Sequence, residues 1–332
     1  MAVNVADAVI SWLGGARVGL SGLSPVEVRR LAGRWCAEVE AVESVHGGEL
    51  LSLEVPPVPK SLTAIAPRRV MLGAHLGSAG EPAEIRVGAH AVVLGTGAEP
   101  DVVRFSRRRP PSPIELDLLI DCGIGHVLAR QGLACFHGCG FELGGTGVFG
   151  LGDSFSGKTT VSVAAMRAGG RVVSDDAVLL APTSGGELAI APTRSFGWLR
   201  GRTVEIATDE LRDKMQSGQE NGQPRWVLRR EDGGEGFVDR AIPNVIWVQS
   251  VDRRLKQSRI EAIDQSQVFA ALIRASSPLF LSRHCPEIRD RLIPVFQRLC
   301  SQCRGYRVRL APRLLEAPVD EMRRLVDLSS EL

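Results

Sequence analysis

One stretch of the sequence combines the residue types that bind phosphate groups. Residues 152–159 read Gly-Asp-Ser-Phe-Ser-Gly-Lys-Thr and fit the pattern G-x-x-x-x-G-K-[ST] of a phosphate-binding loop. Its glycines permit backbone angles that turn successive N–H groups toward phosphate oxygens. Lys158 would neutralise phosphate charge, and the Thr159 hydroxyl would hold Mg²⁺. The alternative is a glycine-rich turn with a chance lysine. The residues predicted to contact the nucleotide are Gly152, Asp153, Ser154, Phe155, Ser156, Gly157, Lys158, Thr159 and Thr160.

Two adjacent carboxylates follow a short distance downstream. The run 170–174 is typical of a short strand, and Asp175 and Asp176 come directly after it. Ligands of open α/β sheets bind outside the carboxyl ends of strands, so both carboxylates are expected to face the phosphates. One would serve as general base toward a hydroxyl, and the other would order Mg²⁺ or its waters; the metal role goes to Asp175 if Asp176 is the base. Taken alone, the pair would be equally typical of a solvated turn.

The order and spacing of these features resemble the bacterial HPr kinase/phosphorylase family, which is related to the ATP-dependent phosphoenolpyruvate carboxykinases. Asp176 lies 18 residues after Lys158, where that family has its proton acceptor, and His137 lies 21 residues before Lys158, where it has an active-site histidine. The resemblance covers about residues 133–192. It implies a P-loop-containing HPr kinase/phosphoenolpyruvate carboxykinase-like domain that uses ATP and Mg²⁺, with Asp176, His137 and Lys158 as catalytic residues. The alternative for His137 is a histidine of the core.

The chain departs from the family pattern after residue 192. The family's downstream glycine-rich segment, with its glutamate ligand for Mg²⁺, has no obvious counterpart here. The chain resembles more the divergent kinases related to HPr kinase, some of which modify ribosomal peptides. A cation is expected to cover the transition-state charge. The candidates are Arg194, the first choice, and Arg200 and Arg202.

These features predict an ATP-dependent kinase that transfers the γ-phosphoryl group to a hydroxyl, with a serine of a protein or peptide as the acceptor. A nucleotide-gated regulatory or interaction NTPase, with water as the only acceptor, is the alternative from another class. A carboxykinase acting on a small acid is a third interpretation, but no further metal-ligand cluster accompanies Asp175 and Asp176.

The rest of the sequence predicts an α/β fold in two domains. Residues 1–110 are interpreted as a smaller N-terminal α+β domain that ends in an Arg/Pro-rich linker at 104–113, and residues 111–332 as the kinase domain. A capping box at Ser24 predicts a helix to about Val45. Further predicted elements are strands at 51–55, 83–87 and 91–94, a helix at 114–131, a hairpin at 177–180 and 187–190, a mobile flap at 216–236, a buried central strand at 244–248, helices at 265–276, 286–302 and 319–328, and a strand at 307–310.

Composition and charge bear on whether the protein binds nucleic acid or a membrane. A net charge of +2, with 5% aromatic residues and no basic stripe, gives no support to nucleic-acid binding. No apolar run reaches the length of a membrane span, and the N-terminus lacks a basic signal region, so we expect a cytoplasmic protein without a membrane partner. The resemblance further suggests a homo-oligomer. The seven cysteines are scattered, and the pair Cys300 and Cys303 is interpreted as core residues in preference to a zinc site.

Overall fold

The computed structural model describes most of the C-terminal part of the chain and the strands of the N-terminal part. The described residues are 6–11, 17–23, 38–42, 50–54, 72–75, 84–87, 89–93, 101–104, 113–193, 196–199, 201–220, 223–276 and 286–331. Within them, no helix is both long and apolar enough to cross a membrane. Residues 105–112 of the predicted linker lie outside this set.

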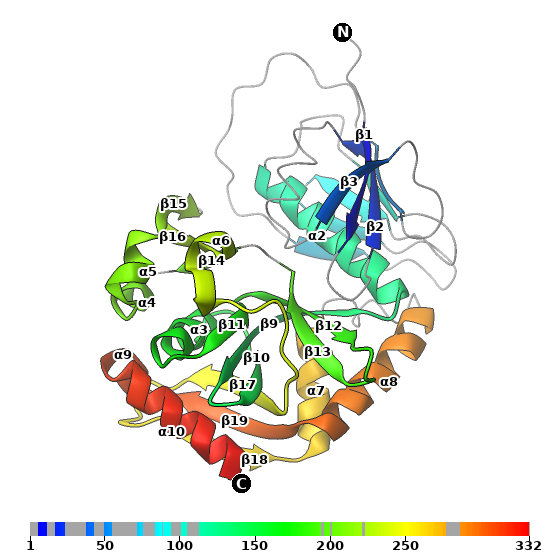
Figure 1. Ribbon diagram of the computed structural model, residues 1–332. Helices are drawn as coiled ribbons and strands as arrows, with labels where there is room; N and C mark the ends of the chain where they lie inside the picture. Colours follow the sequence, from blue (N-terminus) through cyan, green and yellow to red (C-terminus); the bar gives the residue numbers. More distant parts are fainter. Residues whose placement is uncertain are drawn as a thin grey trace. The chain divides into compact units, whose positions relative to one another are not determined.

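The described residues group into two compact units, each with a sheet of its own (Figure 1). The first unit holds the residues up to Leu133 and the beginning of helix α8 (Pro286–Gln302) as far as Leu292. The second unit holds residues 134–276 and those from Ile293 onward. Helix α2 (Pro113–Arg130) therefore groups with the N-terminal strands, because it packs against β6, β7 and β8 of their sheet.

The first unit is an eight-stranded mixed sheet in the order β3-β1-β2-β4-β8-β7-β6-β5. Its strands are β1 (Ala6–Ser11), β2 (Arg17–Leu23), β3 (Glu38–Val42), β4 (Leu50–Glu54), β5 (Leu72–His75), β6 (Glu84–Val87), β7 (His90–Val93) and β8 (Asp101–Arg104). The predictions of strands at 51–55, 83–87 and 91–94 are confirmed, as is the helix at 114–131.

The helix predicted from Ser24 to Val45 is wrong over its last part. Residues 38–42 form β3, which pairs antiparallel with β1. The run Glu38-Val39-Glu40-Ala41 alternates polar and apolar residues with the period of a strand. Residues 24–37 and 43–45 of this prediction lie outside the described residues.

The second unit is a mixed α/β domain around a central mixed sheet in the order β13-β12-β9-β10-β17-β19-β18. Strands β10, β17 and β19 run parallel to one another, and β9 pairs antiparallel with β10, β11 and β12. The strands are β9 (Ala134–Leu143), β10 (Thr146–Leu151), β11 (Arg171–Ser174), β12 (Ala177–Pro182), β13 (Leu188–Pro192), β17 (Val245–Val251), β18 (Arg259–Ile263) and β19 (Arg304–Leu310).

Helices cover both faces of this sheet (Figure 1). Helix α3 (Lys158–Arg167) packs against β9 and against α10 (Pro318–Glu331) on one side, where Trp247 donates a hydrogen bond to Ser329 of α10 at 3.0 Å. Phe149 of β10 points to the other side, where it packs on Phe136, and α7 (Gln265–Ala275) contacts β9, β10, β17 and β19. The predictions of a buried central strand at 244–248, of the 177–190 hairpin and of the three C-terminal helices are confirmed.

The segment 216–236, predicted to be a mobile flap, contains regular secondary structure in its described residues. These residues form β15 (Gln216–Glu220), β16 (Gln223–Arg229), α6 (Arg230–Gly233) and a 3₁₀ turn (Gly234–Gly236). Strand β16 pairs with β15 and with β14 (Phe196–Leu199) in a three-stranded sheet. The side chain of Leu228 is only 3% exposed, so apolar residues of β16 hold this segment on the core despite its polar, glycine-rich flanks.

Candidate functional site

The glycine-rich loop connects β10 to α3 at the carboxyl edge of the parallel strands. Gly157 has φ +94°, in the left-handed region that favours glycine, and an added Cβ would lie 2.7 Å from Leu310 Cδ1. At Gly152, a Cβ would lie 2.4 Å from Ser156 Oγ and 2.6 Å from the Gln249 carbonyl oxygen. Both glycines are therefore required by the conformation of the loop.

Lys158 is the first residue of α3, and its side chain turns back under the loop. Its Nζ donates hydrogen bonds to the carbonyl oxygens of Gly152, at 2.8 Å, and Asp153, at 2.9 Å. Burial lowers the pKa of Lys158 from its ordinary value, whereas neighbouring groups that include Asp176 and Asp175 raise it. The ammonium therefore lies within the field of both carboxylates.

Asp176 and His137 are brought together from different strands. Asp176 lies in the turn between β11 and β12, and His137 lies on β9 opposite Ala177. The distance from His137 Nδ1 to Asp176 Oδ1 is 3.1 Å, and the two side chains are 43% and 36% exposed. The structure thus places His137 in a half-exposed pair with a carboxylate, in contrast to the core position that was its alternative.

Asp175 lies in a different environment from its neighbour. Its Oδ1 is buried and has no hydrogen-bond partner. Burial and the charge of Asp176 hold the pKa of Asp175 well above its usual range, whereas the Thr159 hydroxyl and Lys158 favour the charged form. A cation next to Oδ1 would complete this site, and the donor set fits Mg²⁺, which prefers oxygen ligands and keeps several waters.

Gln249 is a polar residue of this region that the sequence analysis missed. It lies near the carboxyl end of β17, its side chain is 3% exposed, and neither its Oε1 nor its Nε2 has a hydrogen-bond partner. A Cβ at Gly150 would lie 2.9 Å from Gln249 Oε1 and 2.5 Å from Cys139 Sγ, so the amide lies directly beside the beginning of the loop. A polar residue after the apolar run 245–248, at the edge where ligands bind, was the available signal.

The thiol of Cys139 lies between Gln249 and the charged groups. Burial raises its pKa to about 12, with a further increase from Asp175. The thiol is therefore uncharged at neutral pH and adds no negative charge beside Lys158.

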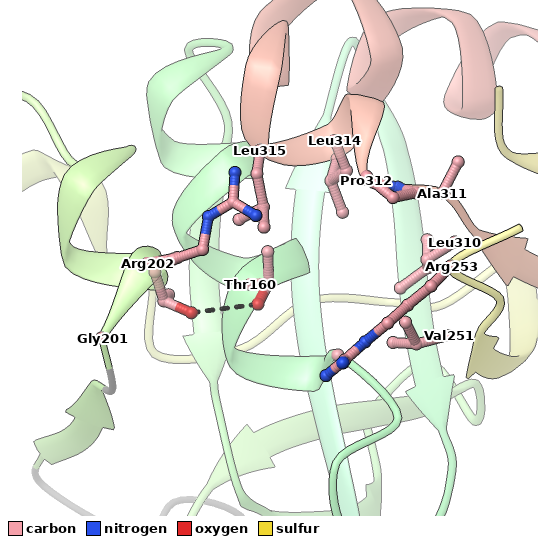
Figure 2. A pocket seen from close by; sticks show the side chains of 12 residues that line it. Thr160, Gly201, Arg202, Val251, Arg253, Leu310, Ala311, Pro312, Leu314 and Leu315 are labelled. Carbon is pink, nitrogen blue, oxygen red and sulfur yellow. Dashed lines mark hydrogen bonds between the residues drawn. The ribbon is translucent and has the colours of Figure 1, made fainter. Parts of the chain in front are cut away.

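A pocket of about 500 Å³ opens beside the beginning of α3 (Figure 2). One wall is Gly157 and Thr160, and the Thr160 hydroxyl is hydrogen-bonded to the Thr203 hydroxyl at 3.0 Å. The opposite wall comes from the end of β19 and from α9 (Arg313–Glu316). Arg202, of α4 (Arg202–Glu205), and Arg253, which follows β17, also line the pocket.

The other predicted site residues are distributed as follows. Asp153, Ser154 and Phe155 are exposed at the tip of the loop, where Phe155 has φ +67°. Arg194 and Arg200 lie outside the described residues. Arg202, the third cation considered, lies at the pocket and not beside the aspartates.

Cys300 and Cys303 are core residues, as predicted. They are 5% and 8% exposed, and the Cys303 thiol donates to the Pro243 carbonyl oxygen at 3.1 Å. Among the described residues, no group of three or more His, Cys, Asp or Glu side chains is placed to hold a metal ion. Cys285, the next cysteine upstream of this pair, lies outside them.

No protein-family model matches the sequence, and no curated protein matches it. Among solved structures, the chain is similar to the Hpr(Ser) kinase/phosphatase from Coxiella burnetii, with 12% sequence identity and a TM-score of 0.30 over 60% of this chain and 99% of that chain. A likeness at this level carries no argument, so the function proposed below depends on the residues of this chain.

Proposed function

We propose that the protein is a kinase that transfers the γ-phosphoryl group of ATP to a hydroxyl, with a serine of a protein or peptide as the acceptor. The observation that carries this proposal is the convergence of two chemistries at one edge of the sheet. Lys158 and the glycine-rich loop would bind the phosphates. The His137–Asp176 pair, 3.1 Å apart, would supply the general base.

Each residue has a defined part in the reaction. The loop N–H groups and Lys158 hold the phosphates. The acceptor oxygen bonds to the γ-phosphorus, the bond from that phosphorus to the β–γ bridging oxygen breaks, and ADP leaves with the electron pair. Asp176 takes the hydroxyl proton. His137 holds the carboxylate of Asp176 in place through its Nδ1.

Asp175 and Thr159 are the residues that would hold Mg²⁺. The buried, unpartnered Oδ1 of Asp175 supports this assignment, because an isolated buried carboxylate oxygen is costly without a cation or a donor. When bound, Mg²⁺ neutralises charge on the β- and γ-phosphates. The two aspartates would therefore have different roles: Asp175, with its buried Oδ1, would bind the metal, and the half-exposed Asp176 would accept a proton.

The exposure of the His137–Asp176 pair favours a polypeptide acceptor over water alone. Both side chains are more than a third exposed, so a hydroxyl on a large substrate can reach the carboxylate. In a regulatory NTPase, by contrast, we would expect a base that water can reach and that a polypeptide hydroxyl cannot.

Transfer of label from [γ-³²P]ATP tests the proposal. The protein is incubated with serine-containing peptides and with the same peptides carrying alanine at each serine. Label on the serine peptides alone, and its loss in Asp176→Asn, is expected. Free phosphate released at one rate with or without peptide would instead support the regulatory NTPase.

A further inference from the structure

The pocket beside α3 is continuous with the glycine-rich loop, because Gly157 belongs to both. Thr160, the third residue of α3, lines the same wall of the pocket as Gly157 (Figure 2). A ligand whose phosphates lie on the loop would therefore have its other end in the pocket. At about 500 Å³, the volume falls within the roughly 300–1,000 Å³ of small-molecule sites.

The lining of the pocket is apolar with a cationic rim. Val251, Leu310, Leu314 and Leu315 contribute apolar surface. Arg202 and Arg253 are both exposed and enter from elements on either side of Thr160 (Figure 2). None of the described lining residues is acidic, so the charge of the pocket is positive and complements an anion.

We infer that this pocket holds the nucleoside end of the nucleotide, with the base against the leucines and the guanidinium groups of Arg202 and Arg253 over the base or the α-phosphate. This inference rests on the proposed function, since it assumes phosphates on the loop. Arginine suits both contacts, because its planar guanidinium stacks on π-systems and pairs with phosphate. Neither arginine was assigned to the nucleotide by the motif.

The lining also fixes how the base is recognised. Among the described lining residues there is no Asp, Glu, Asn or Gln side chain to pair with a base edge; the hydroxyls of Thr160 and Thr203 are hydrogen-bonded to each other, and the two arginines are exposed at the rim. A pocket that recognises its ligand by apolar contact discriminates between similar ligands by only about 10–200-fold. A pocket that hydrogen-bonds its ligand discriminates between them by about 10⁴-fold or more. The pocket therefore selects for a nucleoside and tolerates exchange of the purine.

Calorimetry with ATP, GTP and inorganic tripolyphosphate tests the inference. The wild type is expected to bind ATP at least about tenfold more tightly than tripolyphosphate, and GTP within about tenfold of ATP. Val251→Trp, at a residue that is 45% exposed at the pocket, should abolish the preference for ATP over tripolyphosphate and leave tripolyphosphate affinity within about twofold. Ile273→Trp, at a residue of α7 that is 38% exposed, is the matched control and should change neither.

Photolabelling of the unmodified protein with 8-azido-ATP gives a second measurement, independent of any variant. Label that ATP competes away is expected on peptides containing residues 251–253 or 310–315. Label elsewhere, equal affinity of ATP and tripolyphosphate for the wild type, or an ATP preference that survives in Val251→Trp would each overturn the inference while leaving the phosphate site intact. Failure of both ATP and tripolyphosphate to bind the wild type would overturn the proposed function as well.

Discussion

Lys158 and the two aspartates interact through charge in a region from which water is partly excluded. Burial lowers the pKa of Lys158 and raises that of Asp175, which disfavours both charged forms, whereas the opposite charge of each residue favours the charged form of the other. A phosphate would add negative charge beside Lys158, and Mg²⁺ would add positive charge beside Asp175. The two ligands are therefore expected to bind together more tightly than either alone.

Lys158→Ala should reduce Mg·ATP affinity by about 10–150-fold, the worth of a hydrogen bond to a charged group at about 1.5–3 kcal/mol. Isothermal titration calorimetry measures it, and circular dichroism checks that the fold is retained. Lys214→Ala, at an exposed residue at the end of α5 (Asp209–Asp213), is the control. Wild-type affinity in the Lys158 variant would remove the phosphate site from the loop.

Substitutions of the two aspartates should have different effects. Asp176→Asn keeps the shape but cannot take a proton, so kcat should fall by about 10²–10⁴-fold with nucleotide affinity nearly unchanged. Asp175→Asn should weaken Mg²⁺-dependent nucleotide binding as well as turnover. Steady-state kinetics over a Mg²⁺ titration separates the two. The reverse pattern would mean that the roles are exchanged, and full activity of both variants would exclude this mechanism.

At the scale of residues, the motif predicted where the loop glycines and Lys158 stand in the chain, but it did not predict how buried each side chain of the site is. The spacing of Gly152, Gly157 and Lys158 carried enough information because each position has a strict backbone or charge requirement. Gln249 has no such requirement. Its burial and its unpartnered amide depend on the register of β17 against β10, which pairs Gly150 with Trp247, and register is set by tertiary packing.

At the scale of elements, the segment that the sequence suggested was a flap supports the aspartates. Arg230, at the beginning of α6, donates to the carbonyl oxygens of Val173 and Val238, and its guanidinium lies 5.0 Å from the centroid of the Phe237 ring. Val173 is two residues before Asp175. The side chain of Arg230 is 11% exposed, so these hydrogen bonds are protected from water and hold β11 in place.

Arg230→Met keeps the length of the side chain and removes its donors. It should lower the free energy of unfolding by about 1–3 kcal/mol, because a buried carbonyl loses its partner, and it should lower kcat by displacing the turn that carries Asp175. Urea denaturation and kinetics measure the two effects. Arg240→Met, at an exposed residue nearby, should change neither. Unchanged stability of the Arg230 variant would contradict the bracing role.

The elements that the sequence predicted best are those whose apolar pattern is long and regular. The apolar run 245–248 is typical of a strand that is buried on both faces of a sheet. The helix at 265–275 begins with a complete capping box at Asp264, which is typical of a helix N-terminus. Strands β15 and β16 could not be predicted in the same way. Strand β16 pairs with β15, its neighbour in the sequence, and also with β14, which lies in another part of the sequence; local composition does not reveal the pairing with β14.

At the scale of the whole second unit, a buried carboxylate connects α10 to the sheet edge. Glu321 is 1% exposed; it accepts from the backbone N–H of Ser258 at 2.7 Å and from Arg324. Burial alone would raise the pKa of Glu321, but the hydrogen bonds from Arg324 and Ser258 hold it below the ordinary value of 4.5. The folded state therefore favours the charged form.

The stability that Glu321 contributes should be present above about pH 4.5 and lost as the pH falls through its lower folded pKa. Glu321→Gln should cost about 1–3 kcal/mol at pH 7, and the difference from the wild type should shrink toward pH 3. Urea denaturation at both pH values tests this, with Glu316→Gln, at an exposed residue of α9, as the control. A difference independent of pH would show that Glu321 contributes through packing and not through its charge.

The packing of α10 on α3 also has a consequence for synthesis of the chain. Arg323 of α10 donates to the Ala168 carbonyl oxygen, just past the end of α3. Their first residues, Lys158 and Pro318, are 318 − 158 = 160 residues apart. A ribosome adding about 5–20 residues per second takes roughly 8–32 s to cover that interval. The side of α3 that packs on α10 therefore stays uncovered until α10 is synthesised, whereas β9, on which α3 also packs, precedes α3 in the chain.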